Sequence, residues 1–106
     1  MTISDIRDAM ENRTKIIWSD HASSQLLKRG ISRLDVFACI DNGEIIEDYP
    51  EDYPYPSCLV FGYGTLNGEV KKPIHVVIGF NGEYVWIIIA YVPNNIKFED
   101  DLKTRR

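Results

Sequence analysis

The stretch KPIHVVIGFNGEYVWIIIAYVP, from Lys72 to Pro93, decides the fold because it is the most apolar part of the chain. Two runs rich in β-branched and aromatic residues flank Asn81-Gly82. This residue pair accepts the positive φ angles of a tight type I′ turn, so the pattern predicts a β-hairpin with a two-residue turn. In that register Phe80 pairs with Glu83, and the hairpin forms part of an antiparallel sheet.

This register divides the hairpin into two faces. We expect the aliphatic face to lie against the core, and Tyr91 lies at the far end of this face. Its residues are Ile74, Val76, Ile78, Phe80, Val85, Ile87 and Ile89. The other face is mixed, and on it His75 lies opposite Ile88. A turn longer by one residue would instead place His75 beside Ile89 and Tyr91. His75 either lies half-buried under a loop or joins Trp86 and Tyr84 in an open binding surface.

The N-terminal half of the chain has helical periodicity. Helices are predicted over residues 3–12, over residues 20–29 with Gly30 at the C-terminal cap, and from Ser32 to residue 42 with a capping box. The short apolar run 15–18 is either a strand or the lead-in to the second helix. From residue 44 the period changes to two, which predicts strands over residues 44–49 and 58–66 ahead of the hairpin. The fold class is α+β, with two or three N-terminal helices on one face of a roughly four-stranded antiparallel sheet, in a single domain over residues 1–106.

Charge is unevenly distributed along the 106 residues, which carry a net charge of −4. Residues 42–54 contain five acids and no base, whereas residues 95–106 end in a basic tail. Nucleic-acid binders usually carry a basic face, and the chain as a whole does not. A local basic patch is still possible, and solubility explains the charges equally well.

The chain contains two cysteines and two histidines, and neither spacing is typical of a disulfide scaffold or a structural zinc site. We therefore expect no metal or other cofactor. Free thiols, the absence of a signal-peptide pattern and the lack of an apolar run long enough to span a membrane together predict a cytoplasmic protein.

Six short motifs occur in a characteristic order between about residues 16 and 106: His21-Ala22, Arg29-Gly30-Ile31, Asn42–Pro50, His75-Val76-Val77, Ala90–Pro93 and the basic Lys103–Arg106. With them the chain resembles the bacterial domain of unknown function 4258. Residues 1–14, with the first helix, lie outside the resemblance. That family is similar to the RelE/ParE-type toxin superfamily of small α+β proteins, many of which are mRNA endoribonucleases. Its members are often paired with a small zinc-finger antitoxin.

The resemblance implies a toxin of a type II toxin–antitoxin pair that cleaves mRNA without a metal. Such cleavage needs a base, an acid and cations that stabilise the charged phosphorane. The candidates for proton transfer are His21 and His75, and Tyr91 is a candidate for donating a proton or positioning a phosphate. The candidates for RNA binding are Arg29, Trp86, Lys103, Arg105 and Arg106, of which the cations would clamp phosphate and Trp86 would stack on a base.

Each of these residues also has a purely structural interpretation. His21 lies in the first turn of a helix and Arg29 next to a helix end, where packing, capping and the helix dipole explain them. Tyr91 can anchor the tail, and the tail itself can be disordered. The alternative function is therefore a non-catalytic protein-binding module that uses its open sheet face or an edge strand. A small adaptor with a ligand pocket between sheet and tail is a third reading.

Overall fold

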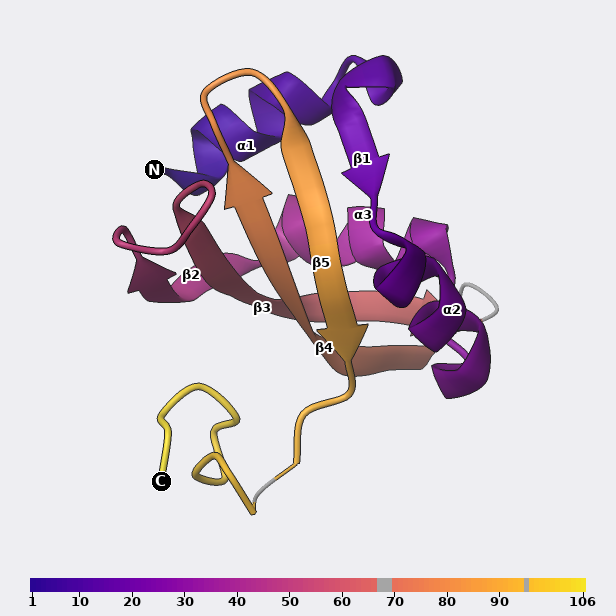
Figure 1. Ribbon diagram of the computed structural model, residues 1–106. Helices are drawn as coiled ribbons and strands as arrows, with labels where there is room; N and C mark the ends of the chain where they lie inside the picture. Colours follow the sequence, from indigo (N-terminus) through magenta and orange to yellow (C-terminus); the bar gives the residue numbers. More distant parts are fainter. Residues whose placement is uncertain (67–69, 95) are drawn as a thin grey trace.

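The structure is a computed structural model that describes residues 1–66, 70–94 and 96–106, and only the backbone at 65, 66, 70 and 71. Figure 1 shows the elements in chain order: α1 (Ile3–Met10), η1 (Arg13–Lys15), β1 (Ile16–Trp18), α2 (Asp20–Arg29), α3 (Arg33–Asn42), β2 (Glu44–Tyr49), β3 (Ser57–Leu66), β4 (Val70–Phe80) and β5 (Val85–Tyr91). Within the described part of the chain, no helix is long and apolar enough to cross a membrane.

The five strands form one mixed sheet in the order β1-β5-β4-β3-β2. The pairs β2–β3, β3–β4 and β4–β5 are antiparallel, and β1 pairs with β5 in parallel, with Ile16 beside Val85. The predicted α+β class is confirmed, but the four-stranded antiparallel sheet is wrong. Within the apolar run 15–18, for which a strand and a helix lead-in were both possible, Ile16–Trp18 form strand β1, because these residues pair with the free edge of β5.

Helices α2 and α3 begin and end where the cap residues predict, whereas α1 ends at Met10, two residues before its predicted end. The Ser19 hydroxyl accepts a hydrogen bond from the Ala22 amide (2.9 Å), and Gly30 ends α2 with a φ of 67°. The capping box of α3 is present, with Ser32 and Asp35 each bonding the other's backbone amide at 3.0 Å. These caps satisfy amides and carbonyls that a helix leaves without partners at its ends.

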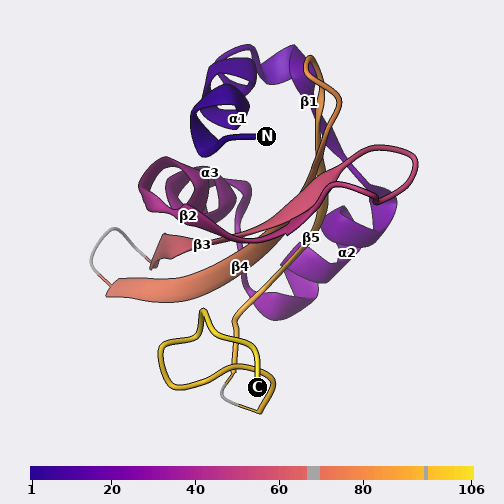
Figure 2. The same cartoon turned by 90° about the vertical axis from the view of Figure 1, so that its left-hand side faces the viewer.

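One apolar core lies between the three helices and the inner face of the sheet. The buried residues of this core include Ile6, Met10, Ala22, Leu26, Val36, Cys39, Ile40, Val60, Ile74, Val76, Ile78, Val85, Ile87 and Ala90. Helix α3 packs very close to β3, since a Cβ atom at Gly62 would lie only 2.2 Å from the Cys39 carbonyl oxygen. Figure 2 shows α3 on one side of β3 and β4 and the C-terminal residues on the other.

The predicted two-residue turn is wrong. Phe80 pairs with Val85 and not with Glu83, so four residues, 81–84, connect β4 to β5. The Asn81 side-chain oxygen accepts hydrogen bonds from the amides of Glu83 (2.9 Å) and Tyr84 (2.7 Å). These hydrogen bonds stabilise a four-residue loop. An Asn-Gly sequence is compatible with such a loop as well as with a two-residue turn.

A β-bulge in β5 changes the face on which its last residues lie. Ile78 pairs with Ile87 and Val77 with Ile89, so Ile88 is an extra residue between the two pairs. Side chains alternate along a strand, and one extra residue therefore exchanges the two faces beyond it. Ala90 consequently joins the core, and the expected core positions of Ile89 and Tyr91 are wrong.

His75 does lie on the face away from the helices, as expected, but its neighbour is different. It pairs with Tyr91 in the register of β4 and β5, and not with Ile88. The bulge thus produces the pairing that a longer turn was expected to give. Because of it, the histidine and the tyrosine lie side by side on the outer face.

Candidate functional site

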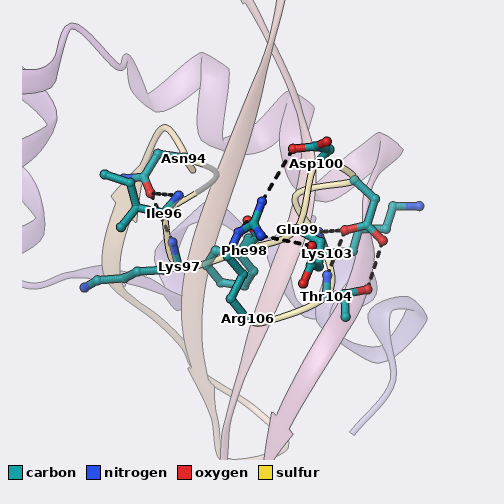
Figure 3. A network of polar contacts seen from close by, with 10 residues as sticks. Asn94, Ile96, Lys97, Phe98, Glu99, Asp100, Lys103, Thr104 and Arg106 are labelled. Atoms are coloured by element: carbon teal, nitrogen blue, oxygen red, sulfur yellow. Dashed lines mark hydrogen bonds and ion pairs between the residues drawn. The ribbon is translucent and has the colours of Figure 1, made fainter.

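Part of the outer face of the sheet is covered by the C-terminal segment, residues 96–106, which lies on the side of β3 and β4 away from α3 (Figure 2). It contacts Glu47 of β2, Phe61 of β3 and His75 of β4. Phe98 anchors this segment, with 2% of its surface exposed and its ring edge-on to His75 at 4.6 Å. Within the segment, the amides of Lys103 and Thr104 both donate to Asp101 at 2.9 Å. Figure 3 shows this network of polar contacts. The predicted basic tail is therefore packed against the domain and is not a solvated, disordered extension.

Beneath this segment His75 is fully buried and both of its ring nitrogens have partners. Nε2 lies 2.7 Å from the Leu102 carbonyl oxygen, and Nδ1 lies 3.2 Å from the Tyr91 hydroxyl oxygen. A carbonyl oxygen can only accept, so Nε2 carries the proton and Nδ1 accepts from the tyrosine hydroxyl. Leu102 has a φ of 61°, a conformation that is rare for residues with a Cβ atom.

The surroundings shift the pKa values of both side chains. Burial lowers the pKa of His75, although the Leu102 carbonyl and the Glu47 carboxylate act in the opposite direction. Burial raises the pKa of Tyr91, against the positive charges of Arg105 and Arg29. At neutral pH the pair is therefore an uncharged imidazole, available as a proton acceptor, and a protonated phenol.

Tyr91 also faces a groove of about 680 Å³, which we call the Tyr91 groove. Three cations line it, Arg29 from α2 and Lys97 and Arg105 from the C-terminal segment. The full lining is Arg29, Ile89, Tyr91, Val92, Asn94, Lys97, Phe98 and Arg105. Arg29 is held in place because it donates to the Ala90 carbonyl oxygen at 2.8 Å. A groove with this lining presents positive charge around a tyrosine hydroxyl.

Arg105 reaches the groove from a bidentate ion pair with Glu47 of β2. Its Nε and one terminal nitrogen lie 3.0 and 2.9 Å from the two carboxylate oxygens. The Tyr49 hydroxyl donates to the same carboxylate. The arginine lowers the pKa of Glu47, and the carboxylate raises that of Arg105 further. A guanidinium has five donors, so this pair leaves Arg105 with hydrogen-bonding capacity on its other terminal nitrogen.

The structure brings together four of the eight predicted site residues: His75, Tyr91, Arg29 and Arg105. His21 is not among them. It is exposed in the first turn of α2, eight residues before Arg29 and so about 12 Å from it along the helix axis. No shared site of His21 and His75 is formed.

The other three predicted residues lie elsewhere. Trp86 stacks on Tyr55 with ring centroids 4.6 Å apart, at the opposite end of β5 from Tyr91. Lys103 forms an ion pair with Glu44 at 2.9 Å, and Arg106 pairs with Glu99 at 3.2 Å. These residues hold the C-terminal segment or cover the sheet, and they do not line the Tyr91 groove.

Sequence reasoning missed the groove residues Lys97, Asn94 and Phe98 and the role of Glu47. Phe98 was the available signal, because a large apolar residue in an otherwise charged tail indicates that the tail packs on the domain. Nothing in the sequence pattern pairs Glu47 with Arg105, since 58 positions separate them. In the described part of the chain no three His, Cys, Asp or Glu side chains converge as metal ligands would.

Comparison with known proteins adds one match. The family described as Domain of unknown function (DUF4258) matches residues 18–92, which is more than two thirds of the chain. The match includes His75, Tyr91 and Arg29 and excludes α1 and the C-terminal segment. No curated protein and no solved structure matches the chain. The extent of the family match is nevertheless sufficient, and the chain belongs to the family Domain of unknown function (DUF4258).

Proposed function

We propose that this protein is an endoribonuclease that cleaves mRNA in the Tyr91 groove without a metal, and that it acts as the toxin of a type II toxin–antitoxin pair with a RelE/ParE-like site. The observation that carries the proposal is the hydrogen bond between the buried His75 and Tyr91, a residue that lines a groove with three cations. The antitoxin expected from the family resemblance, a small zinc-finger protein, belongs to the same proposal.

The chemistry divides among the residues of the groove. The 2′-hydroxyl of a bound ribose attacks the adjacent phosphorus and passes its proton to the Tyr91 oxygen, while the Tyr91 proton moves to Nδ1 of His75. His75 then carries a positive charge, which the Leu102 carbonyl stabilises through Nε2–H. Reversal of the transfer returns a proton to the leaving 5′-oxygen. The products are a 2′,3′-cyclic phosphate and a 5′-hydroxyl end.

The cations supply the electrostatic part. Arg29 and Arg105 flank Tyr91 and would stabilise the charged phosphorane, and Lys97 would hold the neighbouring phosphate. The lysine forms no ion pair among the residues that the structure describes. Since the chain as a whole has a net charge of −4, RNA binding would depend on this local cluster and weaken steeply with salt.

The test is conditional expression in a bacterial host, followed by incubation of the purified protein with RNA in the presence of a chelator. Tyr91→Phe removes only the hydroxyl. We expect this variant to cause no growth arrest and to cleave RNA at a rate lower by roughly 100-fold or more. Arg29→Gln should weaken RNA binding, whereas Lys28→Gln, a change of equal charge outside the groove, should not. Growth arrest that persists in Tyr91→Phe would refute the proposed site. No arrest and no cleavage by the wild type would refute the activity.

A further inference from the structure

A second concave site lies on the same outer face, at the other end of β5. It is a small cavity of about 140 Å³, which we call the Trp86 pocket. Its lining is mostly aromatic and apolar: Asp52, Tyr53, Pro54, Tyr55, Gly79, Trp86 and Ile88. None of these residues lines the Tyr91 groove, so the two sites are separate.

The floor of the Trp86 pocket is a glycine that packing does not require. Gly79 pairs with Trp86 in the middle of the sheet, and a Cβ atom there would meet Ile88 Cδ1 at 3.5 Å and Trp86 Cβ at 3.7 Å. These are ordinary contact distances. A glycine inside a strand lowers stability, and it often marks a place where a ligand or another backbone comes close.

The walls of the pocket combine stacked rings with solvent-exposed apolar surface. Tyr55 and Trp86 stack with an interplanar angle of 21°, and Trp86 is only partly buried. Tyr53 is 92% exposed, and Tyr55 and Ile88 are each 38% exposed. Exposed aromatic residues around a pocket are typical of an interaction site rather than of a solvated surface.

The rim of the pocket is acidic. Asp52 is fixed there because its carboxylate accepts a hydrogen bond from Ser57 at 2.5 Å. Glu51 is exposed next to it on the connection between β2 and β3, and no cation pairs with either of these two acids in the described part of the chain. The charge of this end of the face is opposite to that of the Tyr91 groove, and it disfavours a polyanion.

We propose that the Trp86 pocket binds a basic, extended segment of a partner protein, with one arginine or lysine side chain in the pocket. The aliphatic stem of such a side chain suits the apolar lining, its cation interacts with the aromatic walls, and Asp52 pairs with it. The cavity volume fits one side chain, since a cavity of about 150 Å³ accommodates a single benzene ring. This function does not depend on RNA cleavage in the Tyr91 groove.

The two tryptophans of the chain make the proposal testable by NMR, because each indole N–H gives its own signal. Trp18 serves as the internal reference, since it lies on β1 beneath Arg33 at 4.7 Å. The probes are a peptide of three Arg-Pro-Leu repeats and its counterpart with Glu in place of Arg. We expect the arginine peptide to shift the Trp86 signal in a saturable way without moving that of Trp18, and the glutamate peptide to shift neither.

Two variants connect the binding to the pocket without disturbing the fold. Gly79→Ala adds a methyl group at the floor, and Glu51→Lys reverses one charge at the rim, so each should weaken binding of the arginine peptide roughly threefold or more. Leu27→Ala, at a residue 87% exposed on α2, should leave binding unchanged. Equal binding of both peptides, or an unchanged affinity in both pocket variants, would overturn the proposal. A Trp86 shift with an oligocytidylate and none with the arginine peptide would instead indicate a nucleobase site.

Discussion

Tyr91 donates its hydroxyl hydrogen to Nδ1 of His75, and the two side chains meet only because β5 carries one residue more than β4 between the loop and this pair. The residue that makes the difference is Ile88, which has no partner in β4. The pair therefore depends on a backbone irregularity as much as on the identity of the two residues.

Removal of the Tyr91 hydroxyl should destabilise the protein. In Tyr91→Phe the buried Nδ1 of His75 loses its donor, and an unsatisfied buried acceptor costs about 1–3 kcal/mol. Urea denaturation followed by circular dichroism measures this cost. Tyr53→Phe is the matched control, because Tyr53 is 92% exposed and its substitution should change stability by less than about 0.5 kcal/mol. Equal stability of the two variants would show that the hydrogen bond is not formed in solution.

Stability should decrease as the pH falls through the titration range of His75. Burial holds the pKa of His75 in the folded state below its ordinary value of 6.5, so the unfolded chain binds the proton more readily. The stabilisation is complete above pH 6.5 and is lost as the pH falls toward the folded-state pKa. Unfolding free energies measured at pH 7.5 and 5.5 should differ in the wild type and in His21→Gln, and less in His75→Gln. The same pH dependence in His75→Gln as in the wild type would contradict the assignment.

The ion pair between Arg105 and Glu47 should matter for the C-terminal segment more than for the domain. Arg105→Gln should lower global stability by less than about 1 kcal/mol, because half of the Arg105 side chain is exposed. It should nevertheless accelerate hydrogen exchange of the amides of Leu102 and Arg106, which donate to Glu99 and Lys97 within the segment. Lys103→Gln breaks a more exposed pair and should have the smaller effect. Identical exchange rates in the two variants would show that the Arg105–Glu47 ion pair holds the segment no more strongly than the Lys103–Glu44 pair.

Substitution by alanine should be much more destabilising at one glycine of the sheet than at another. Gly62→Ala places a methyl group 2.2 Å from the Cys39 carbonyl oxygen, so α3 must move away from β3 at a cost of roughly 3 kcal/mol or more. Gly79→Ala meets nothing closer than 3.5 Å and should change stability by no more than about 1 kcal/mol. Thermal denaturation of the two variants checks this contrast. A similar loss in both would mean that the outer face is packed more tightly than these distances indicate.

Side-chain alternation was enough to predict most of the core. Ile74, Val76, Ile78, Val85 and Ile87 are buried as expected, because the real loop is two residues longer than the predicted turn and the change preserves parity. The bulge was not predictable, since Ile88 and Ile89 are equally suited to either face. A run of three isoleucines contains no polar residue that would locate the irregularity.

The site was only partly predictable for a related reason. The residue types of His75, Tyr91, Arg29 and Arg105 indicated chemistry, but their convergence depends on the packing of the C-terminal segment, which no periodic pattern specifies. His21 was an equally suitable proton-transfer group and Lys103 an equally suitable phosphate ligand, but both lie outside the groove. Local charge and hydrophobicity identify candidates, whereas tertiary contacts between distant positions decide which of them meet.

The bulge divides strand β5 into two parts in which the inward and outward positions alternate with opposite parity. Before Ile88 its inward residues support the helices, and after Ile88 its outward residues carry the tyrosine of the groove. Substitution of an inward residue before the junction, such as Val85 or Ile87, therefore acts on the core, whereas substitution of the outward Tyr91 after it acts on the bond to His75 and on the groove. A deletion of one residue at the junction would turn Tyr91 toward the core and leave His75 without its donor.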